Sequence, residues 1–432
     1  MKKRIFVIGQ CTLHWGRMEF GNIGNFYIAK PLFEELRRVF PETEIATTMQ
    51  FSEKFCQKYM IETVPMELYY DFDSGNNLEE AVREYTSVSK GTDLVTPYIE
   101  QVKRADLVID FSGDIWGSNA DFLGDDRFAV GCYKDMTAQL LCPTVMLAGS
   151  PGPFQNVEIT ELARKAYEGF AFVSNREPIS TRLLRSQGFN LENTYDYPCP
   201  SFLFTQAEEK EMEVILGKYA FNQEKRIKVG FIMCGWNFKK GPFSLWPRGE
   251  DEYENFAEIV KYLADQYQAH IYLLSHSNGF DVPPNPFVLR HGRDFPVMEQ
   301  LYEIVCNSGK YDDSVTLLNG IYSPEETKAI ISNFDVLISG RMHGAVAGIS
   351  QEIPTMIIDY GHEPKAHKLR GFAEVCGMAQ MIADPNNKQE LLEKVDYLLT
   401  EQTDIQKKLV GKMEQIKTEA RMQFDQLKKY MR

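Results

Sequence analysis

The chain alternates short apolar runs with longer amphipathic stretches, and a turn or a glycine separates most of them. This alternation is typical of βαβ units, in which helices join parallel strands. In the first half the apolar runs predict strands at residues 4–8, 43–48, 107–111, 144–148, 170–174 and near Thr194. The stretches between them predict helices at residues 25–40, 78–85, 98–103, 159–167 and 179–187.

The same alternation restarts in the second half. Apolar runs there predict strands at residues 228–234, 270–275, 315–318, 336–339 and 355–359. Amphipathic stretches predict helices at residues 250–268, 298–306, 324–333, 344–350 and 366–376. Ser323 precedes Pro324 and is followed three residues later by Glu326, a capping box with proline at the first helical position.

Two successive α/β segments of similar size predict two Rossmann-like domains facing a cleft. The first would cover residues 1–205 and the second residues 226–387. A charged stretch without a strong apolar face, residues 206–225, is interpreted as the linker, and residues 388–432 as a helical segment.

Composition narrows the class of protein. The chain has 432 residues, of which 44% are hydrophobic and 25% charged, as in an ordinary globular protein. Its formal net charge of −14 disfavours a nucleic-acid partner, because such a protein needs a basic surface. The eight cysteines form no CxxC pair and no export signal is visible, so we expect reduced thiols, a cytoplasmic protein and no metal site.

The clearest candidate chemistry follows the strand at 336–339, where Ser339-Gly340-Arg341-Met342-His343 leads into a helix. The amide groups at a helix start favour an anion, and Arg341 can clamp a carboxylate or phosphate with two hydrogen bonds. His343 can exchange a proton near neutral pH. The structural alternative is an Arg–Asp pair beside a histidine whose hydrogen bonds are satisfied.

Other loops follow strands at the same predicted sheet edges. Gly21-Asn22-Ile23-Gly24-Asn25 precedes a helix, and Ser112-Gly113-Asp114 and Arg176 each follow a strand. Arg176 is a second candidate anion clamp, with a structural salt bridge as its alternative. Trp236 belongs to an aromatic loop that can stack on a sugar or line a contact between domains.

Taken together, these segments resemble the polysaccharide pyruvyl transferase family over about residues 5–380. The most specific part is Ser339-x-Arg341-x-His343, followed by further matching positions: Gly348, Pro354, Tyr360, His367, Lys368, Gly371, Phe372 and Gly377. Weaker matches precede it at residues 21–25, 112–114, 149–154 and 176–180.

The resemblance implies a GT-B-like arrangement of the two domains. It implies phosphoenolpyruvate as donor and co-substrate, with no bound cofactor, and a pair of sugar hydroxyls as acceptor. The product would be a cyclic pyruvate ketal on a precursor of a cell-surface polysaccharide, as in capsule or exopolysaccharide biosynthesis. The acceptor would be a nucleotide sugar or a lipid-linked oligosaccharide.

Phosphoenolpyruvate carries a carboxylate and a phosphate, so it needs at least two cationic clamps. The catalytic residues would be His343 as general acid or base, Arg341 on the donor, and Asp114 on an acceptor hydroxyl. The donor site would be built from Arg176, Ser339, Arg341, His367 and Lys368. The acceptor site would be built from Gly21, Asn22, Asn25, Gly113 and Trp236.

Two alternatives remain. One is a GT-B-type glycosyltransferase or sugar-nucleotide epimerase, since the fold does not fix the reaction. The other is a non-catalytic glycan-assembly protein, against which the intact Arg341 and His343 argue.

The end of the chain has two interpretations as well. Residues 407–432 contain eight Lys/Arg against three Asp/Glu and an imperfect apolar stripe. This helix either packs back on the domains or makes a peripheral contact with the anionic inner face of the membrane.

Overall fold

The structure, a computed structural model, describes residues 2–9, 18–117, 124–239, 245–282, 284–362 and 367–432, without the side chain of Asp114. The described chain divides into two compact units. Unit 1 consists of Met1–Met18, Ala29–Pro200 and Thr418–Arg432, and unit 2 of Glu19–Ile28 and Ser201–Lys417.

Unit 1 contains a parallel sheet of seven strands in the order β3-β2-β1-β4-β5-β6-β7. The strands are β1 Arg4–Ile8, β2 Glu44–Thr47, β3 Ile61–Thr63, β4 Leu107–Asp110, β5 Thr144–Gly149, β6 Phe172–Asn175 and β7 Thr194–Asp196. The central strands are buried along their whole length, which explains why the sequence shows continuous apolar runs there. The short strand β3 was not predicted.

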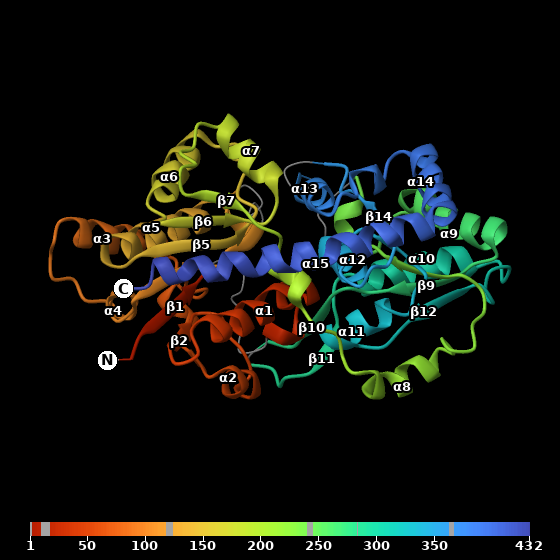
Figure 1. Cartoon of the computed structure of the whole chain (residues 1–432), viewed down its shortest axis with the longest axis horizontal. Coiled ribbons are helices and arrows are strands. Elements are labelled where there is room, and N and C mark those ends of the chain that lie inside the picture. Colours follow the sequence, from red (N-terminus) through yellow and green to blue (C-terminus); the bar gives the residue numbers. More distant parts are fainter. Residues whose placement is uncertain (1, 10–17, 118–123, 240–244, 283, 363–366) are drawn as a thin grey trace. The chain divides into compact units, whose positions relative to one another are not determined.

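The helices of unit 1 surround this sheet (Figure 1). They are α1 Ile23–Val39 from Ala29 on, α2 Glu53–Tyr59, α3 Asn77–Ser89, α4 Pro97–Lys103, α5 Asp125–Leu141, α6 Val157–Glu168 and α7 Pro178–Ser186. The sequence did not predict α2 or α5. Helix α5 is buried on nearly all sides, and its buried Arg127, Lys134 and Asp135 interrupt the apolar periodicity by which amphipathic helices are found.

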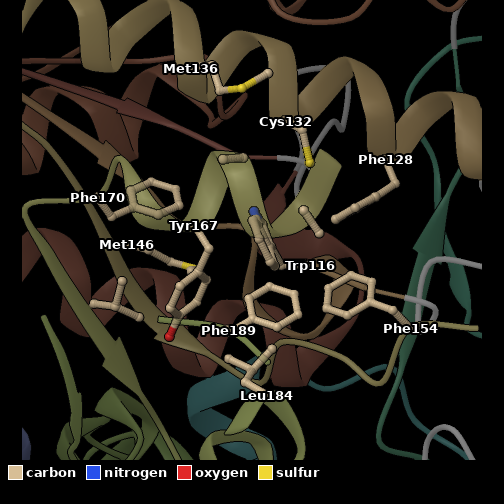
Figure 2. Close-up of a cluster of buried hydrophobic side chains, with 13 residues drawn as sticks. Trp116, Phe128, Cys132, Met136, Met146, Phe154, Tyr167, Phe170, Leu184 and Phe189 are labelled. Carbon is tan, nitrogen blue, oxygen red and sulfur yellow. The ribbon is translucent and has the colours of Figure 1, made fainter. Parts of the chain in front are cut away.

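Aromatic side chains dominate one part of the core of unit 1 (Figure 2). Trp116 is fully buried and meets the rings of Phe128 and Phe154 edge-on, with centroids 5.3 and 5.8 Å away. Such edge-to-face pairs add to the free energy gained by burying the rings. They fix the loop after β4, from which Trp116 projects.

A pair of buried carboxyl groups lies beside Trp116. The amide and hydroxyl of Ser112 donate to Asp110 over 2.9 and 2.8 Å, and the indole N–H of Trp116 donates to Asp135 over 3.4 Å. Burial raises the pKa of Asp110 to about 6. Burial and then the charge of Asp110 raise the pKa of Asp135 well above its usual range. The protonation of one carboxyl group therefore depends on that of the other.

Unit 2 contains a parallel sheet of six strands in the order β12-β9-β8-β13-β14-β15. The strands are β8 Lys228–Ile232, β9 His270–Leu274, β12 Val315–Leu318, β13 Val336–Ser339, β14 Thr355–Ile358 and β15 Ile382–Ala383. Numbered within the unit this is the order 3-2-1-4-5-6 of nucleotide-binding Rossmann domains. A separate antiparallel hairpin, β10 Asn278–Phe280 and β11 Leu289–His291, is inserted after β9. The prediction of two Rossmann-like α/β units is therefore confirmed, while the hairpin and β15 were not predicted.

Most helices of unit 2 lie close to their predicted positions, but the first of them was not predicted. They are α8 Glu209–Lys218, α9 Glu254–Tyr267, α10 Phe295–Cys306, α11 Pro324–Ile331, α12 Met342–Ile349, α13 His367–Cys376, α14 Lys388–Thr400 and α15 Gln402–Gln426 up to Lys417. The expected capping box at Ser323 is present: its hydroxyl accepts from the amide of Glu326 over 3.1 Å, with Pro324 first in α11.

The units differ from the predicted domain boundaries in three places. Residues 206–225, interpreted as a linker, contain α8, whose Met212 and Leu216 are buried within unit 2. The start of α1 belongs to unit 2, although it lies near the beginning of the chain. The end of α15 belongs to unit 1.

Helix α15 buries most of its apolar side chains, although Val410 and Met422 of the predicted stripe are exposed. The buried positions are Ile405, Leu409, Met413, Ile416, Ala420 and Phe424, with Leu427 just after the helix. In unit 1 the Gln423 side chain accepts from Ser174 over 2.8 Å and donates to the carbonyl of Pro198 over 3.1 Å. The stripe therefore serves packing, and the basic side chains Lys407, Lys408, Lys428 and Lys429 are left exposed. Among the described residues, none of the helices combines the length and apolarity that crossing a bilayer requires.

The raised pKa values of Asp110 and Asp135 generate a prediction about stability. Because burial raises the pKa of Asp110 to about 6, against an unfolded value of about 3.9, the pair favours folding most at low pH. This contribution is lost as the pH rises from about 4 through about 6. In Asp135→Asn the amide oxygen can still accept from Trp116 and the amide N–H can donate to Asp110. The substitution removes the second carboxyl charge from the pair. We expect its Tm to exceed that of the wild type by a few degrees at pH 8, and by less at pH 5.

Thermal unfolding monitored between pH 5 and pH 8 measures this difference. Asp93→Asn, at an exposed position, is the control and should leave the pH dependence as in the wild type. A gap between Asp135→Asn and the wild type that stays constant with pH would contradict the raised pKa values of the pair.

Candidate functional site

The two central strands of unit 2, β8 and β13, pair in parallel with Ser339 opposite Ile232. The strand that follows β8 in the chain, β9, lies on one side of β8 in the sheet. The strand that follows β13, β14, lies on the opposite side of β13, so the direction of strand addition reverses between β8 and β13. In open α/β sheets this switch point, at the carboxyl ends of the strands, is where ligands bind. The loops at residues 233–238 and 340–343 leave the sheet here.

A buried asparagine joins the ends of three strands at this edge. Asn237 donates to the carbonyls of Gly340, Ile358 and Asp359 over 3.2, 3.4 and 3.2 Å. Its own oxygen accepts from the amide of Cys234 over 2.9 Å. Asn237 thereby satisfies carbonyls at the ends of β13 and β14 that would otherwise be buried without a partner. Asn237 was not predicted from the sequence, and only its place just after a strand could have indicated it.

The turn after β13 is shaped by Ser339. Its hydroxyl donates to the carbonyl of Arg341 over 2.9 Å and accepts from the Arg341 amide over 3.2 Å. A Cβ on Gly344 would lie 2.6 Å from this hydroxyl, so a glycine is needed for α12 to approach the strand. The described contacts of Ser339 thus organise the turn that aims Arg341 and His343.

Arg341 forms a two-pronged ion pair with Asp294. Its Nε donates to one carboxylate oxygen over 2.9 Å and its Nη2 donates to the other. The Asp294 side chain is fully buried and that of Arg341 is 12% exposed. Burial alone would lower the pKa of Arg341, but the charge of Asp294 raises it above its ordinary value. The Arg–Asp pair that the sequence left open as an alternative is therefore present.

Two further basic side chains lie near this pair. The charge of Arg341 acts on Arg293, whose pKa is lowered mainly by burial. His276 is 1% exposed, and burial together with the charge of Arg341 lowers its pKa to about 3. His276 is therefore neutral at working pH, and within the described residues its Nε2 makes no hydrogen bond. Arg293, Arg341 and Asp294 therefore act on one another electrostatically at the switch point, and arginine is the residue type that binds carboxylates and phosphates.

His276 and Asp294 were missed by the sequence analysis. His276 is the second residue after β9 and Asp294 directly precedes α10, so both lie at the same sheet edge as Arg341. Only their positions after a strand and before a helix could have indicated these two residues, because neither lies in a recognisable motif.

The turn at residues 21–25 belongs to unit 2. Asn22 caps α1, since its side-chain oxygen accepts from the amide of Gly24 over 2.9 Å. The carbonyl of Gly21 accepts from the amide of Asn278, 3.1 Å away at the start of the hairpin. A Cβ on Gly24 would lie 2.6 Å from Nδ1 of His343. The residues predicted on the acceptor side, Gly21, Asn22 and Asn25, therefore lie in the same unit as Arg341 and His343.

The rings of Trp236, Tyr360 and His362 form a group in unit 2, which we call the aromatic wall. The Trp236 ring lies 6.2 Å from Tyr360 and 6.0 Å from His362, and the carbonyl of Trp236 is 3.2 Å from Nε2 of His362. The Lys368 ammonium lies 5.8 Å from the centre of the Tyr360 ring. His367 and Lys368 are both buried in the first turn of α13.

The remaining predicted site residues lie in unit 1. The Arg176 Nε donates to the hydroxyl of Ser150 over 2.7 Å, and the Ser150 amide donates to the carbonyl of Gly113 over 3.1 Å. Ser150 thus brings together the loops after β4, β5 and β6. Gly113 has a φ of +64°, which favours glycine. The side chain of Asp114 lies outside the described part of the chain.

Solved structures show the same fold. A glycosyltransferase from Rickettsia africae has a TM-score of 0.58 at 10% identity, with 99% of each chain covered. HepE from Anabaena, solved with UDP, has a TM-score of 0.57 at 11% identity, covering 99% of this chain and 98% of that one. The UDP-GlcNAc 2-epimerase of Neisseria meningitidis, bound to UDP-GlcNAc, has a TM-score of 0.57 at 13% identity, covering 99% and 100%. At these identities the likeness establishes the fold alone, and it confirms the expected GT-B-like class.

No curated protein matches the sequence significantly. The sequence model of the polysaccharide pyruvyl transferases matches residues 22–362. That match runs from the cap of α1 to the aromatic wall at His362 and includes Arg341 and His343. Since it spans well over half of the sequence, the chain belongs to the polysaccharide pyruvyl transferase family.

Proposed function

We propose that the protein transfers pyruvate from phosphoenolpyruvate to two hydroxyls of a sugar, forming a cyclic ketal on a precursor of a cell-surface polysaccharide. The observation that carries this proposal is the cluster of charged and titratable side chains at the switch point of unit 2. There, Arg341 is held by Asp294, Arg293 lies nearby, and His343 is two residues from Arg341. A donor with a carboxylate and a phosphate suits an arginine that is held in place in this way.

The reaction balances without a cofactor. Protonation of C3 makes C2 electrophilic, the first sugar hydroxyl adds to C2, and the bond from C2 to the phosphate oxygen breaks. The second hydroxyl then closes the ring at C2. Of the two hydroxyl protons, one balances the proton taken up at C3 and the other leaves with phosphate. In this scheme His343 moves the protons and Arg341 holds a donor anion.

The other predicted residues take supporting roles in the same proposal. Arg176, Ser339, His367 and Lys368 would complete the donor site. Asp114 and Gly113, with Gly21, Asn22 and Asn25, would serve the acceptor. Trp236 supplies an apolar ring face of the kind on which sugars stack. The acceptor would be a nucleotide sugar or a lipid-linked oligosaccharide, and the protein would act in the cytoplasm.

Binding of phosphoenolpyruvate is the first expectation. A ligand that binds only the folded protein stabilises it by about 2.7 kcal/mol at a hundredfold excess over Kd, which raises Tm by several degrees. Arg341→Lys keeps a charge beside the buried Asp294 but loses the two-pronged geometry, so we expect at most half of this rise. Thermal-shift titrations with phosphoenolpyruvate and with UDP-glucose measure the effect.

Arg290→Lys is the matched control, because Arg290 forms a similar two-pronged pair with Asp281 on the exposed hairpin. It should retain the full rise. A rise with UDP-glucose and none with phosphoenolpyruvate would overturn the proposal in favour of sugar-nucleotide chemistry.

Proton transfer by His343 is the second expectation. His343→Ala should lower turnover by about 10²–10⁴-fold, the usual loss for a general acid–base residue, while phosphoenolpyruvate still raises Tm. Phosphate release with a panel of UDP-sugars and alkyl glycosides as acceptors measures turnover. His270→Ala, at the amino end of β9 and hence at the opposite sheet edge, is the control. Near-normal turnover in His343→Ala would remove His343 from the mechanism.

A peripheral membrane contact is a further part of the proposal, supported by the exposed lysines of α15. Lys428 and Lys429 are exposed at the end of the chain. Attraction to an anionic surface amounts to about 1 kcal/mol per lysine. We expect Lys428→Glu/Lys429→Glu to reduce co-sedimentation with phosphatidylglycerol vesicles by about tenfold or more at low salt. Equal sedimentation of the variant and the wild type would exclude the short 3₁₀ turn after α15, Leu427–Lys429, as the contact.

A further inference from the structure

Gly24 lies in the first turn of α1, where a glycine has no conformational reason to be. Its φ is not positive, unlike that of Gly113 or Gly152. Glycine is also a poorer helix former than almost any other residue. An explanation for Gly24 must therefore come from the space around it.

That space is filled by His343. A Cβ on Gly24 would lie 2.6 Å from Nδ1, 3.0 Å from Cγ and 3.1 Å from Cβ of this histidine. These atoms include the root of the side chain, which cannot swing away as the end of a flexible chain would. Two glycines in other helices, Gly217 in α8 and Gly411 in α15, have nothing within 4 Å of such a Cβ. The backbone of α1 at Gly24 is thus in close contact with the imidazole.

The start of α1 is itself firmly held in unit 2. Asn22 caps it, as described above. One turn further, the ring of Tyr27 stacks on Phe204 with centroids 4.3 Å apart, and its hydroxyl donates to the carbonyl of Pro324 over 3.2 Å. The same ring meets His276 edge-on at 5.3 Å. The first two turns of α1 therefore contact both histidines, His343 through Gly24 and His276 through Tyr27.

We propose that Gly24 is a positioning residue whose bare backbone sets the place of the His343 imidazole. The proposal rests on the proposed role of His343, and it adds a residue that acts through that histidine without touching the reacting atoms. A helix start encoded more than 300 residues earlier then determines where the proton-transferring group lies. Displacing a reacting group by about 1 Å can lower a rate by about 10²-fold.

Gly24→Ala tests this directly, with Gly217→Ala as the matched control in an open helical position. The first readout is the imidazole ¹⁵N spectrum of the histidine-labelled protein, which has seven histidines. The His343 signals are identified by their absence in His343→Gln. We expect Gly24→Ala to shift them and Gly217→Ala to leave them in place.

The second readout is turnover, by phosphate release with the acceptor that the panel selects. We expect kcat of Gly24→Ala to fall by about 10–100-fold with KM for phosphoenolpyruvate little changed. In the His343→Gln background, Gly24→Ala should cause no further loss, because the group through which it acts is already gone.

The third readout is Tm, which decides the case in which the variant folds poorly. Gly24→Ala should lower Tm more in the wild type than in the His343→Ala background, where most of the ring contact is absent. Unchanged His343 signals in Gly24→Ala, or an equal loss of Tm in both backgrounds, would overturn the proposal. If the wild type neither binds phosphoenolpyruvate nor releases phosphate, the proposed function fails, while the spectrum and Tm still decide the role of Gly24.

Discussion

The candidate site depends first on the ion pair between Arg341 and Asp294. Each residue immediately precedes a helix, Arg341 before α12 and Asp294 before α10, so the pair joins two helix starts at the switch point of unit 2. Removing one member of a buried pair leaves an uncompensated charge and costs about 3–5 kcal/mol. The pair also fixes the guanidinium plane, so the remaining N–H groups of Arg341 point in a defined direction. A rigid clamp of this kind loses less entropy on binding than a mobile one.

Close packing around this pair depends on small residues and on one amide. Glycines at positions 344 and 348 let α12 approach β13, since a Cβ at either would lie within 2.7 Å of side-chain atoms of the sheet. Asn237 fills the space beside Gly340, where a Cβ would come within 2.2 Å of the amide oxygen. Because the interior is close-packed, a shift at any of these contacts would move the Arg341–His343 turn.

Each unit is completed by a segment distant in sequence. Unit 2 includes Glu19–Ile28, and unit 1 includes Thr418–Arg432. Helices α1 and α15 therefore each belong to both units, one near each end of the chain. The buried Gln423, hydrogen-bonded to Ser174 and Pro198, shows how firmly the last segment is built into unit 1. Most apolar side chains of this basic helix are buried, as its packing interpretation predicts.

The sequence by itself determined the fold class and the segment that follows β13. Buried parallel strands appear as continuous apolar runs, and Ser339-x-Arg341-x-His343 is a local motif, so both are visible without tertiary information. Helix α5 was missed because buried polar groups mask its periodicity, and β3 and the hairpin are too short to be distinguished from loops. Only the tertiary structure decided which residues surround Arg341 and His343. Asp294, His276, Asn237 and Gly24 are brought together by strand order and helix packing, and these contacts join positions up to about 300 residues apart, which no local pattern encodes.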